Sequence, residues 1–217
     1  MKASRVFSFV LIGLVALWAS PAVAGPFTPI SNPDAAYLAG TNYIDFSGYT
    51  LFADYTSITD GFLTVTFGSS MNMRYAPGGG WSTWSCVPDS QRPCDSTTLP
   101  VLYSNGAALI HMTLSTPEYI FGFEAEPNPF APYNMTASFF DASHTLLGTI
   151  TRNVDGTAGA RLFAASMDPI MFVDFSSDVD FAVGAFRYGD GVPEPSTYAL
   201  MLTGLAGLAI LRRRLVS

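Results

Sequence analysis

Two glutamates have the residue type and spacing that glycan chemistry would require. Glu118, Glu124 and Glu126 flank one predicted strand, and the side chains of Glu124 and Glu126 would face the same side. Glycoside hydrolysis uses two carboxyl groups, one to donate a proton and one to attack or to activate water. Sixteen acidic residues lie in the central region, so some pair meets this spacing by accident. The pattern favours solvated charges on a strand face over a catalytic pair.

Aspartates form a second group of candidate residues. Asp174, Asp178 and Asp180 occur in Asp-Phe-Ser-Ser-Asp-Val-Asp, and Asp45 falls in a predicted early strand. Calcium takes several carboxylate and carbonyl oxygens, and it could bind here to connect loops. The spacing does not match an EF-hand loop. A simple acidic loop is favoured over this calcium site, and no other cofactor is expected.

The long polar loop over residues 76–100 contains two tryptophans and both cysteines. Trp81 and Trp84 could stack on the flat faces of sugar rings, or they could fold back and cover the end of the domain, which is the favoured alternative. Cys86 and Cys94 predict a disulfide in an oxidising compartment. No neighbouring Cys or His completes a zinc site.

The two histidines offer few catalytic options. His111 lies on the less apolar face of a predicted strand, and His144 lies in a predicted turn. Neither accompanies a serine or cysteine in a nucleophile elbow. The metalloprotease, P-loop and dinucleotide fingerprints are absent as well. We therefore expect surface histidines, no catalytic residues and a protein that is not an enzyme.

Alternating strands must position these residues. Alternation of apolar and polar residues dominates the region between Gly25 and Gly191, with turn residues every eight to twelve positions. The clearest pair, residues 133–140 and 145–150, predicts a hairpin with its turn at 141–144. Many short strands at this spacing, rich in Phe and Tyr, predict an all-β, antiparallel β-sandwich over residues 25–191. The other predicted strands cover residues 62–67, 107–115, 119–124, 161–165, 170–175 and 181–188.

The charge of this central region excludes several classes of partner. It contains five arginines, no lysine and sixteen acidic residues, which leaves a net charge near −11. Such a surface repels phosphate backbones, so nucleic acid is excluded as a partner. It also disfavours docking on anionic lipid and helps to keep an exported protein soluble.

The N-terminus has the parts of a secretory signal peptide. Lys2 and Arg5 precede the apolar run 6–18, and Ala22-Val23-Ala24 supplies a small-residue cleavage site. We expect residues 1–24 to be removed. An uncleaved N-terminal anchor is the alternative.

The C-terminus combines a proline-rich motif with a membrane segment. Residues 192–197 read Val-Pro-Glu-Pro-Ser-Thr, residues 198–211 carry no charge, and a basic stop follows. Fourteen helical residues span about 21 Å, less than the hydrocarbon core of about 30 Å, but snorkelling arginines could extend the embedded length. We expect a transmembrane helix with its basic end in the cytoplasm and the domain outside. The basic stop consists of Arg212, Arg213 and Arg214.

This order of parts resembles the PEP-CTERM sorting signal of Gram-negative bacteria. The resemblance rests on Val192, Pro193, Glu194 and Pro195, the membrane segment and the basic stop, so residues 192–217 form the signal. It implies a partner, an exosortase-type transpeptidase that would cut near the Pro-Glu-Pro triplet. The protein would be anchored in the inner membrane before processing and would then pass to the cell surface, with exopolysaccharide as a further candidate partner.

A second resemblance concerns the domain. Residues 121–188, with the hairpin Phe-Phe-Asp-Ala-Ser-x-x-Leu-Leu-Gly, are similar to jelly-roll-like domains often joined to this signal. The resemblance implies a fold and no activity. The leading hypothesis is therefore an exported surface or matrix protein that binds glycan or another matrix component. A carboxylate-dependent glycan-cleaving enzyme and a purely structural surface protein remain alternatives.

Overall fold

The computed structural model describes residues 26–84, 99–190 and Gly204. Within this part of the chain the protein is almost entirely β, with one short helix, so the predicted all-β class is confirmed. All strand pairings between the elements are antiparallel. The elements are β1 (Thr28–Ile30), α1 (Ala35–Ala39), β2 (Asn42–Tyr43), β3 (Asp54–Thr59), β4 (Thr64–Ala76), β5 (Leu99–Tyr103), β6 (Leu109–Pro127), β7 (Pro132–Phe140), β8 (Leu146–Asp155), β9 (Arg161–Ser177) and β10 (Phe181–Gly189).

The predicted hairpin is present as β7 and β8. Met135, Ala137 and Phe139 are buried in β7, and the residues between them are half-buried, as alternation requires. The side chain of Asp141 accepts hydrogen bonds from the backbone N–H groups of Ser143 and Thr145 and so fixes the turn. The hydroxyl of Ser143 also donates to this carboxylate, and its hydrogen bond, together with the two from the backbone, holds the pKa of Asp141 below its ordinary value.

Strands β6 and β9 form one long ribbon that folds over. The sequence predicts two strands within each; the structure joins them, with register shifts near residues 114–119. A straight strand of 19 residues would extend about 63 Å. Instead, the carbonyl of Ala108, just before β6, accepts a hydrogen bond from the N–H of Ser177. The N–H of Asn128, just after β6, donates to the carbonyl of Asp180, only three residues from Ser177. The two ends of β6 therefore lie together, and the fold of the ribbon lies near Pro117 and Pro169.

The folded ribbon gives the domain two layers. Layer one contains β3, the start of β4, the first half of β6, the second half of β9, β7 and β8. Layer two contains β5, β10, the second half of β6, the first half of β9, β1 and β2. One core of buried residues includes Met112 and Phe175 from layer one and Phe123 and Phe163 from layer two, so the layers pack face to face. This β-rich arrangement fits a jelly-roll-like domain.

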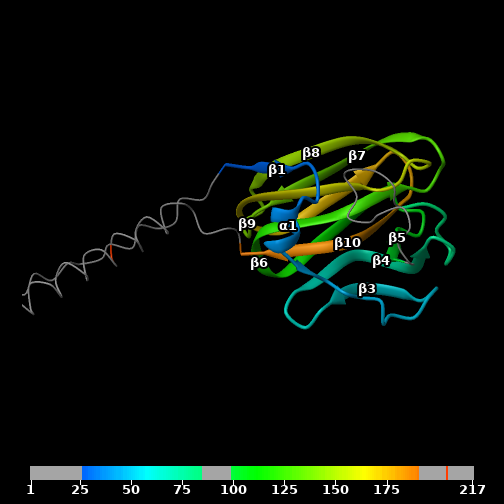
Figure 1. Cartoon of the computed structure of the whole chain (residues 1–217), viewed down its shortest axis with the longest axis horizontal. Coiled ribbons are helices and arrows are strands. Elements are labelled where there is room, and N and C mark those ends of the chain that lie inside the picture. The colour runs from blue at the N-terminus through cyan, green and yellow to red at the C-terminus, as the bar shows by residue number, and fades with distance from the viewer. Residues whose placement is uncertain (1–25, 85–98, 191–203, 205–217) are drawn as a thin grey trace, which may run out of the picture.

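The outer faces of the two layers differ. Helix α1 and the segment 77–84 cover layer two, where Tyr37 and Trp84 pack in two small buried clusters. In Figure 1, α1 lies across the strands, and β1 begins at the same side of the domain at which β10 ends. The outer face of layer one has no such cover among the described residues, and it contains the candidate site.

Strand β1 is held by an aromatic contact as well as by pairing with β9. The ring of Phe27 lies where a side chain of Gly148 would be, with a ring carbon 2.3 Å from an added Cβ. We expect Gly148→Ala to displace Phe27 and to lower the free energy of unfolding by about 1–3 kcal/mol. Chemical denaturation measures this change. Ser143→Ala, in the neighbouring exposed turn, is the comparison, and equal stability of both variants would contradict this role of Phe27.

Several expectations concern residues that the structure does not describe. They are the signal peptide 1–24, the Cys86–Cys94 disulfide, the motif 192–197 and, apart from Gly204, the helix 198–211. Among the described residues no helix is long and apolar enough to cross a membrane. Asp45, predicted to lie in a strand, instead follows β2 in a loop, where its side chain accepts a hydrogen bond from the backbone of Ser47.

Candidate functional site

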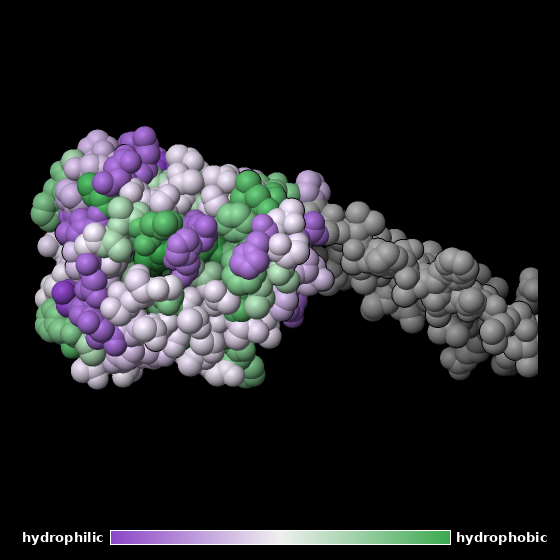
Figure 2. Space-filling model, turned by 180° about the vertical axis from the view of Figure 1, so that it is seen from behind, coloured by the Kyte–Doolittle hydropathy of each residue, from purple (hydrophilic) through white to green (hydrophobic). Residues whose placement is uncertain are grey.

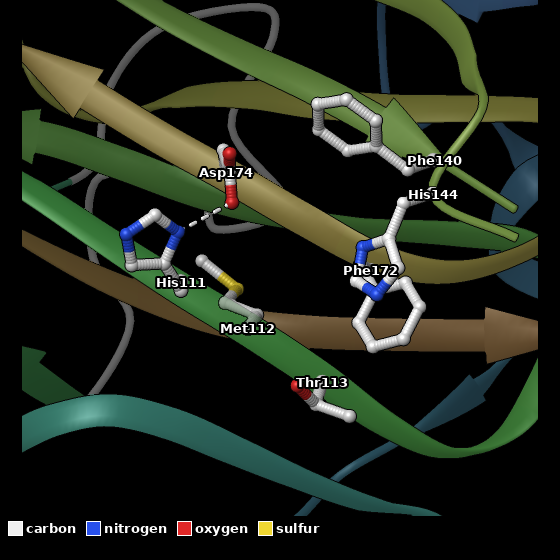
Figure 3. A pocket seen from close by; sticks show the side chains of 7 residues that line it. All are labelled: His111, Met112, Thr113, Phe140, His144, Phe172 and Asp174. Atoms are coloured by element: carbon white, nitrogen blue, oxygen red, sulfur yellow. Dashed lines mark hydrogen bonds and ion pairs between the residues drawn. The ribbon is translucent and has the colours of Figure 1, made fainter. Parts of the chain in front are cut away.

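An open pocket of about 300 Å³ lies on the outer face of layer one. It is formed by residues of β6, β7 and β9 together with the turn between β7 and β8 (Figure 3). Seen from behind, the surface has hydrophobic and hydrophilic patches next to one another (Figure 2). The lining residues are His111, Met112, Thr113, Phe140, His144, Phe172 and Asp174.

A histidine–aspartate pair forms the polar side of the pocket. His111 on β6 lies directly opposite Asp174 on β9, and Nδ1 of the histidine is 2.6 Å from Oδ1 of the aspartate. The side chains are 61% and 40% exposed, so both can reach a ligand. Nε2 of His111 has no partner among the described residues. The pair thus presents a ring nitrogen and a carboxylate oxygen to the pocket.

Aromatic rings form the apolar side. His144 has a φ of 60°, in the left-handed region where histidine is enriched, and the turn directs its ring back over β9. There it stacks on Phe172, with ring centroids 4.0 Å apart and planes inclined by 13°. Phe140 lies opposite Phe172 in the neighbouring strand. Figure 3 shows the stacked rings across the pocket from the His111–Asp174 pair.

This combination suits a ligand with both apolar and hydroxylated surfaces. Binding pockets commonly combine apolar walls with a few polar groups that fix orientation. Here half-exposed rings can contact a flat apolar surface, while Asp174 accepts hydrogen bonds and Thr113 both donates and accepts them. A sugar ring has these two kinds of surface. The predicted surface position of both histidines is confirmed, and both line this pocket.

The glutamate pair lies on the other layer and is buried. Glu124 and Glu126 are on one face of β6, as predicted, but neither side chain is exposed to solvent. The expectation of solvated charges is therefore wrong. The glutamates are buried because Trp81 and Trp84, about 40 residues earlier in the chain, cover this face. The indole N–H of Trp81 donates to Glu126 at 2.8 Å, and that of Trp84 donates to Glu124 at 3.0 Å.

Glu126 is held in an environment that favours its neutral form. Burial raises its pKa to about 7, against opposing hydrogen bonds from Thr83 and Trp81. The single hydroxyl hydrogen of Thr83 has two acceptors in reach, the carboxyl of Glu126 and the carbonyl of Gly156. Protonated Glu126 resolves this competition, because it can donate to Thr83 while Thr83 donates to Gly156.

Both tryptophans are buried in a cluster over layer two. Trp81 is 7% exposed and Trp84 is 3% exposed, so neither offers the open ring face that sugar stacking requires. The favoured expectation, in which they fold back over the domain, describes their position, whereas the less favoured stacking role does not fit their burial. Gly184 provides the space for Trp84, since an added Cβ there would lie 3.2 Å from its ring.

The three aspartates do not meet at one point. Asp174 pairs with His111, whereas Asp180 accepts hydrogen bonds from Tyr103 and Asn128. Asp178 is exposed. Across the described residues, no three His, Cys, Asp or Glu side chains are grouped so that they could hold a metal ion. Asp174, Asp178 and Asp180, the less favoured calcium candidate of the sequence, therefore do not form a group of ligands in the described part of the chain.

Sequence reasoning found the two histidines and Asp174 but did not bring them together. Phe140 and Phe172 were missed altogether. Alternation places each residue on a face of its own strand, but the pairing of β9 with both β6 and β7 has no local signal. The turn at 141–144 was the available clue, because it brings His144 beside whichever strand neighbours β7.

The fold and the C-terminal sequence together define the class of protein. The chain has a jelly-roll-like β domain followed by a sorting signal. The family model of the PEP-CTERM protein-sorting motif matches residues 191–214. This match implies an exported protein that is anchored at the membrane and processed by an exosortase.

Comparison with solved structures adds only distant matches. The enzymatically active domain of tailspike protein 4 from bacteriophage CBA120 is 16% identical with a TM-score of 0.29, over 58% of this chain and 19% of its own. The arabinose-bound α-L-arabinofuranosidase MgGH51 is 9% identical with a TM-score of 0.30, over 75% of this chain and 24% of its own. The chain thus spans a quarter or less of either, and neither carries an argument about function. No curated protein matches the chain.

Proposed function

We propose that this protein is an exported surface or matrix protein that binds glycan through the pocket on layer one. The observation that carries the proposal is the stacked His144–Phe172 pair facing the His111–Asp174 pair across an open pocket. The sorting motif supports it, because it directs the domain towards the outside of the cell, where exopolysaccharide is found.

We infer a binding role rather than a catalytic one. The alternative, a glycan-cleaving enzyme, would use Glu124 and Glu126. Both carboxyl groups are covered by the tryptophans that bond to them, so a substrate would have to displace a packed segment to reach either group. The exposed pocket offers one carboxylate, Asp174, and it is already paired with a histidine.

Binding is tested with the folded domain on a panel of immobilised neutral and acidic polysaccharides. We expect Phe172→Ala to lower the affinity of the bound glycan about tenfold or more, because it removes the ring that supports His144 and so disrupts the aromatic side of the pocket. Isothermal titration against a soluble fragment measures the change.

The matched control is Phe62→Ala, since Phe62 is an aromatic residue that is 86% exposed and does not line the pocket. Its affinity should equal that of the wild type. Equal losses in both variants, or wild-type protein that binds no polysaccharide, would contradict the proposed function.

A further inference from the structure

A ladder of uncharged polar pairs crosses the β7–β8 hairpin. Three cross-strand pairs on its outer face are joined through their side chains. Asn153 donates to Asn134 at 3.0 Å, the hydroxyls of Thr136 and Thr151 are 3.0 Å apart, and those of Ser138 and Thr149 are 3.3 Å apart. Successive pairs are two residues apart along each strand, so the ladder is about 14 Å long.

The ladder begins at the pocket. Ser138, at one end of the ladder, lies directly opposite Asp174 in the neighbouring strand β9. Phe140, which lines the pocket, is two residues further along β7 on the same face. The ladder and the pocket are therefore one continuous surface that extends from β6 across β9 to β8.

The chemistry of the ladder is unusual for its place in the sheet. No strand pairs with the outer edge of β8 among the described residues. Edge strands commonly carry charges that oppose unwanted pairing. Along the three pairs this face instead presents hydroxyls and amides, and the charged residues of β8, Arg152 and Asp155, lie outside the ladder. Each hydroxyl has one hydrogen and two lone pairs, so bonding within a pair leaves capacity for a ligand.

Cross-strand threonine pairs also stabilise sheets without any ligand, which is the simpler account of their presence. Stabilisation alone does not explain an uncharged track that starts at a pocket. Neutral sugar chains are long, flexible and covered with hydroxyls, so they match a row of uncharged donors and acceptors.

We propose that the ladder extends the pocket, so that the ligand is a neutral chain of several sugar units and not a single sugar. This inference rests on the proposed function and deepens it. One or two units would occupy the pocket, and the following units would lie along β7 and β8. Affinity should then increase with chain length until the ladder is filled.

The experiment uses neutral gluco-oligosaccharides of one to six units, in β-1,3 and β-1,4 series, titrated against the folded domain. We expect wild-type affinity to increase about tenfold or more between the shortest binding oligomer and the hexamer. Thr151→Glu, which places a charge in the middle of the ladder, should cancel this gain and leave the affinity of the shortest oligomer unchanged. Thr151→Val replaces only the hydroxyl with a methyl group and should cancel part of the gain in affinity with length.

Thr66→Glu is the control, because Thr66 is an exposed threonine of the same layer, beside Thr113 on the other side of the pocket. It should retain the full gain with length. Affinity that does not depend on chain length, or a gain lost equally in Thr66→Glu, would contradict the role of the ladder in binding. The role of the pocket would be unaffected. If no oligomer of either series binds the wild type, both the pocket and the ladder fail for neutral glucans.

Discussion

Trp84→Ala should lower the free energy of unfolding by about 3–5 kcal/mol, among the largest effects of any single substitution in this domain. The ring of Trp84 is almost completely buried over layer two, close to Gly184 and Val101. Its indole N–H donates to the buried carboxyl of Glu124. The substitution therefore opens a cavity and removes a hydrogen bond from a group that has no contact with water.

Chemical denaturation of Trp84→Ala and Trp84→Phe separates the two contributions. Trp84→Phe keeps one aromatic ring and loses the donor with a smaller part of the buried volume, so it should cost about 1–3 kcal/mol. Phe62→Ala removes an exposed ring and should cost almost nothing. Trp84→Phe should also bind glycan as the wild type does. A folded Trp84→Phe variant that had lost glycan binding would show that Trp84 takes part in ligand binding.

The second large effect is a dependence of stability on pH that belongs to Glu126. Burial raises the pKa of Glu126 to about 7 from an ordinary value of 4.5. Below pH 4.5 the carboxyl is neutral in both the folded and the unfolded chain, and its full contribution to stability is present. As the pH increases towards 7, the unfolded chain loses the proton while the folded chain keeps it. The free energy of unfolding should therefore fall by about 3 kcal/mol across this window.

Glu126→Gln should remove this decline, because glutamine is neutral at every pH and can donate to Thr83 in place of the protonated carboxyl. Denaturant titrations at intervals from pH 4 to pH 8 give the free energies of unfolding for both proteins. Asp178→Asn, which removes an exposed carboxylate, is the control and should follow the wild type. Parallel curves for Glu126→Gln and the wild type would show that Glu126 is ionised in the folded protein.

Alternation in the sequence predicted the strands from β6 onwards, but it missed β1, β2, β3, β5 and the second half of β4, and it did not predict the layers. Met135, Ala137 and Phe139 face the core as their spacing requires. In the second half of β6 every residue from Ile120 to Pro127 is buried, so alternation of burial disappears there. The sequence pattern predicts that a glutamate on such a strand is solvated, since no residue near it indicates that residues 77–84 cover it.

A glycine gave a local clue to the cover that α1 provides on the same layer. An added Cβ at Gly122 would lie 2.2 Å from the side chain of Ala164 and 2.9 Å from the hydroxyl of Tyr37. Glycine within a strand often marks a place where other atoms approach closely. The candidate pocket had no equivalent clue, because its residues come from strands that are far apart in the sequence and meet only through β9.

The position of β10 has a consequence for the order of events during export. β10 is the last strand before the sorting motif, yet it lies inside layer two, bonded to β2, β5 and β6. Pairings between such distant segments form slowly, because the long intervening chain must first be closed into a loop. In a chain that crosses the membrane unfolded, the domain cannot complete its fold until residues 181–189 have crossed. Folding is thus a late event, completed only when the chain next to the sorting motif emerges.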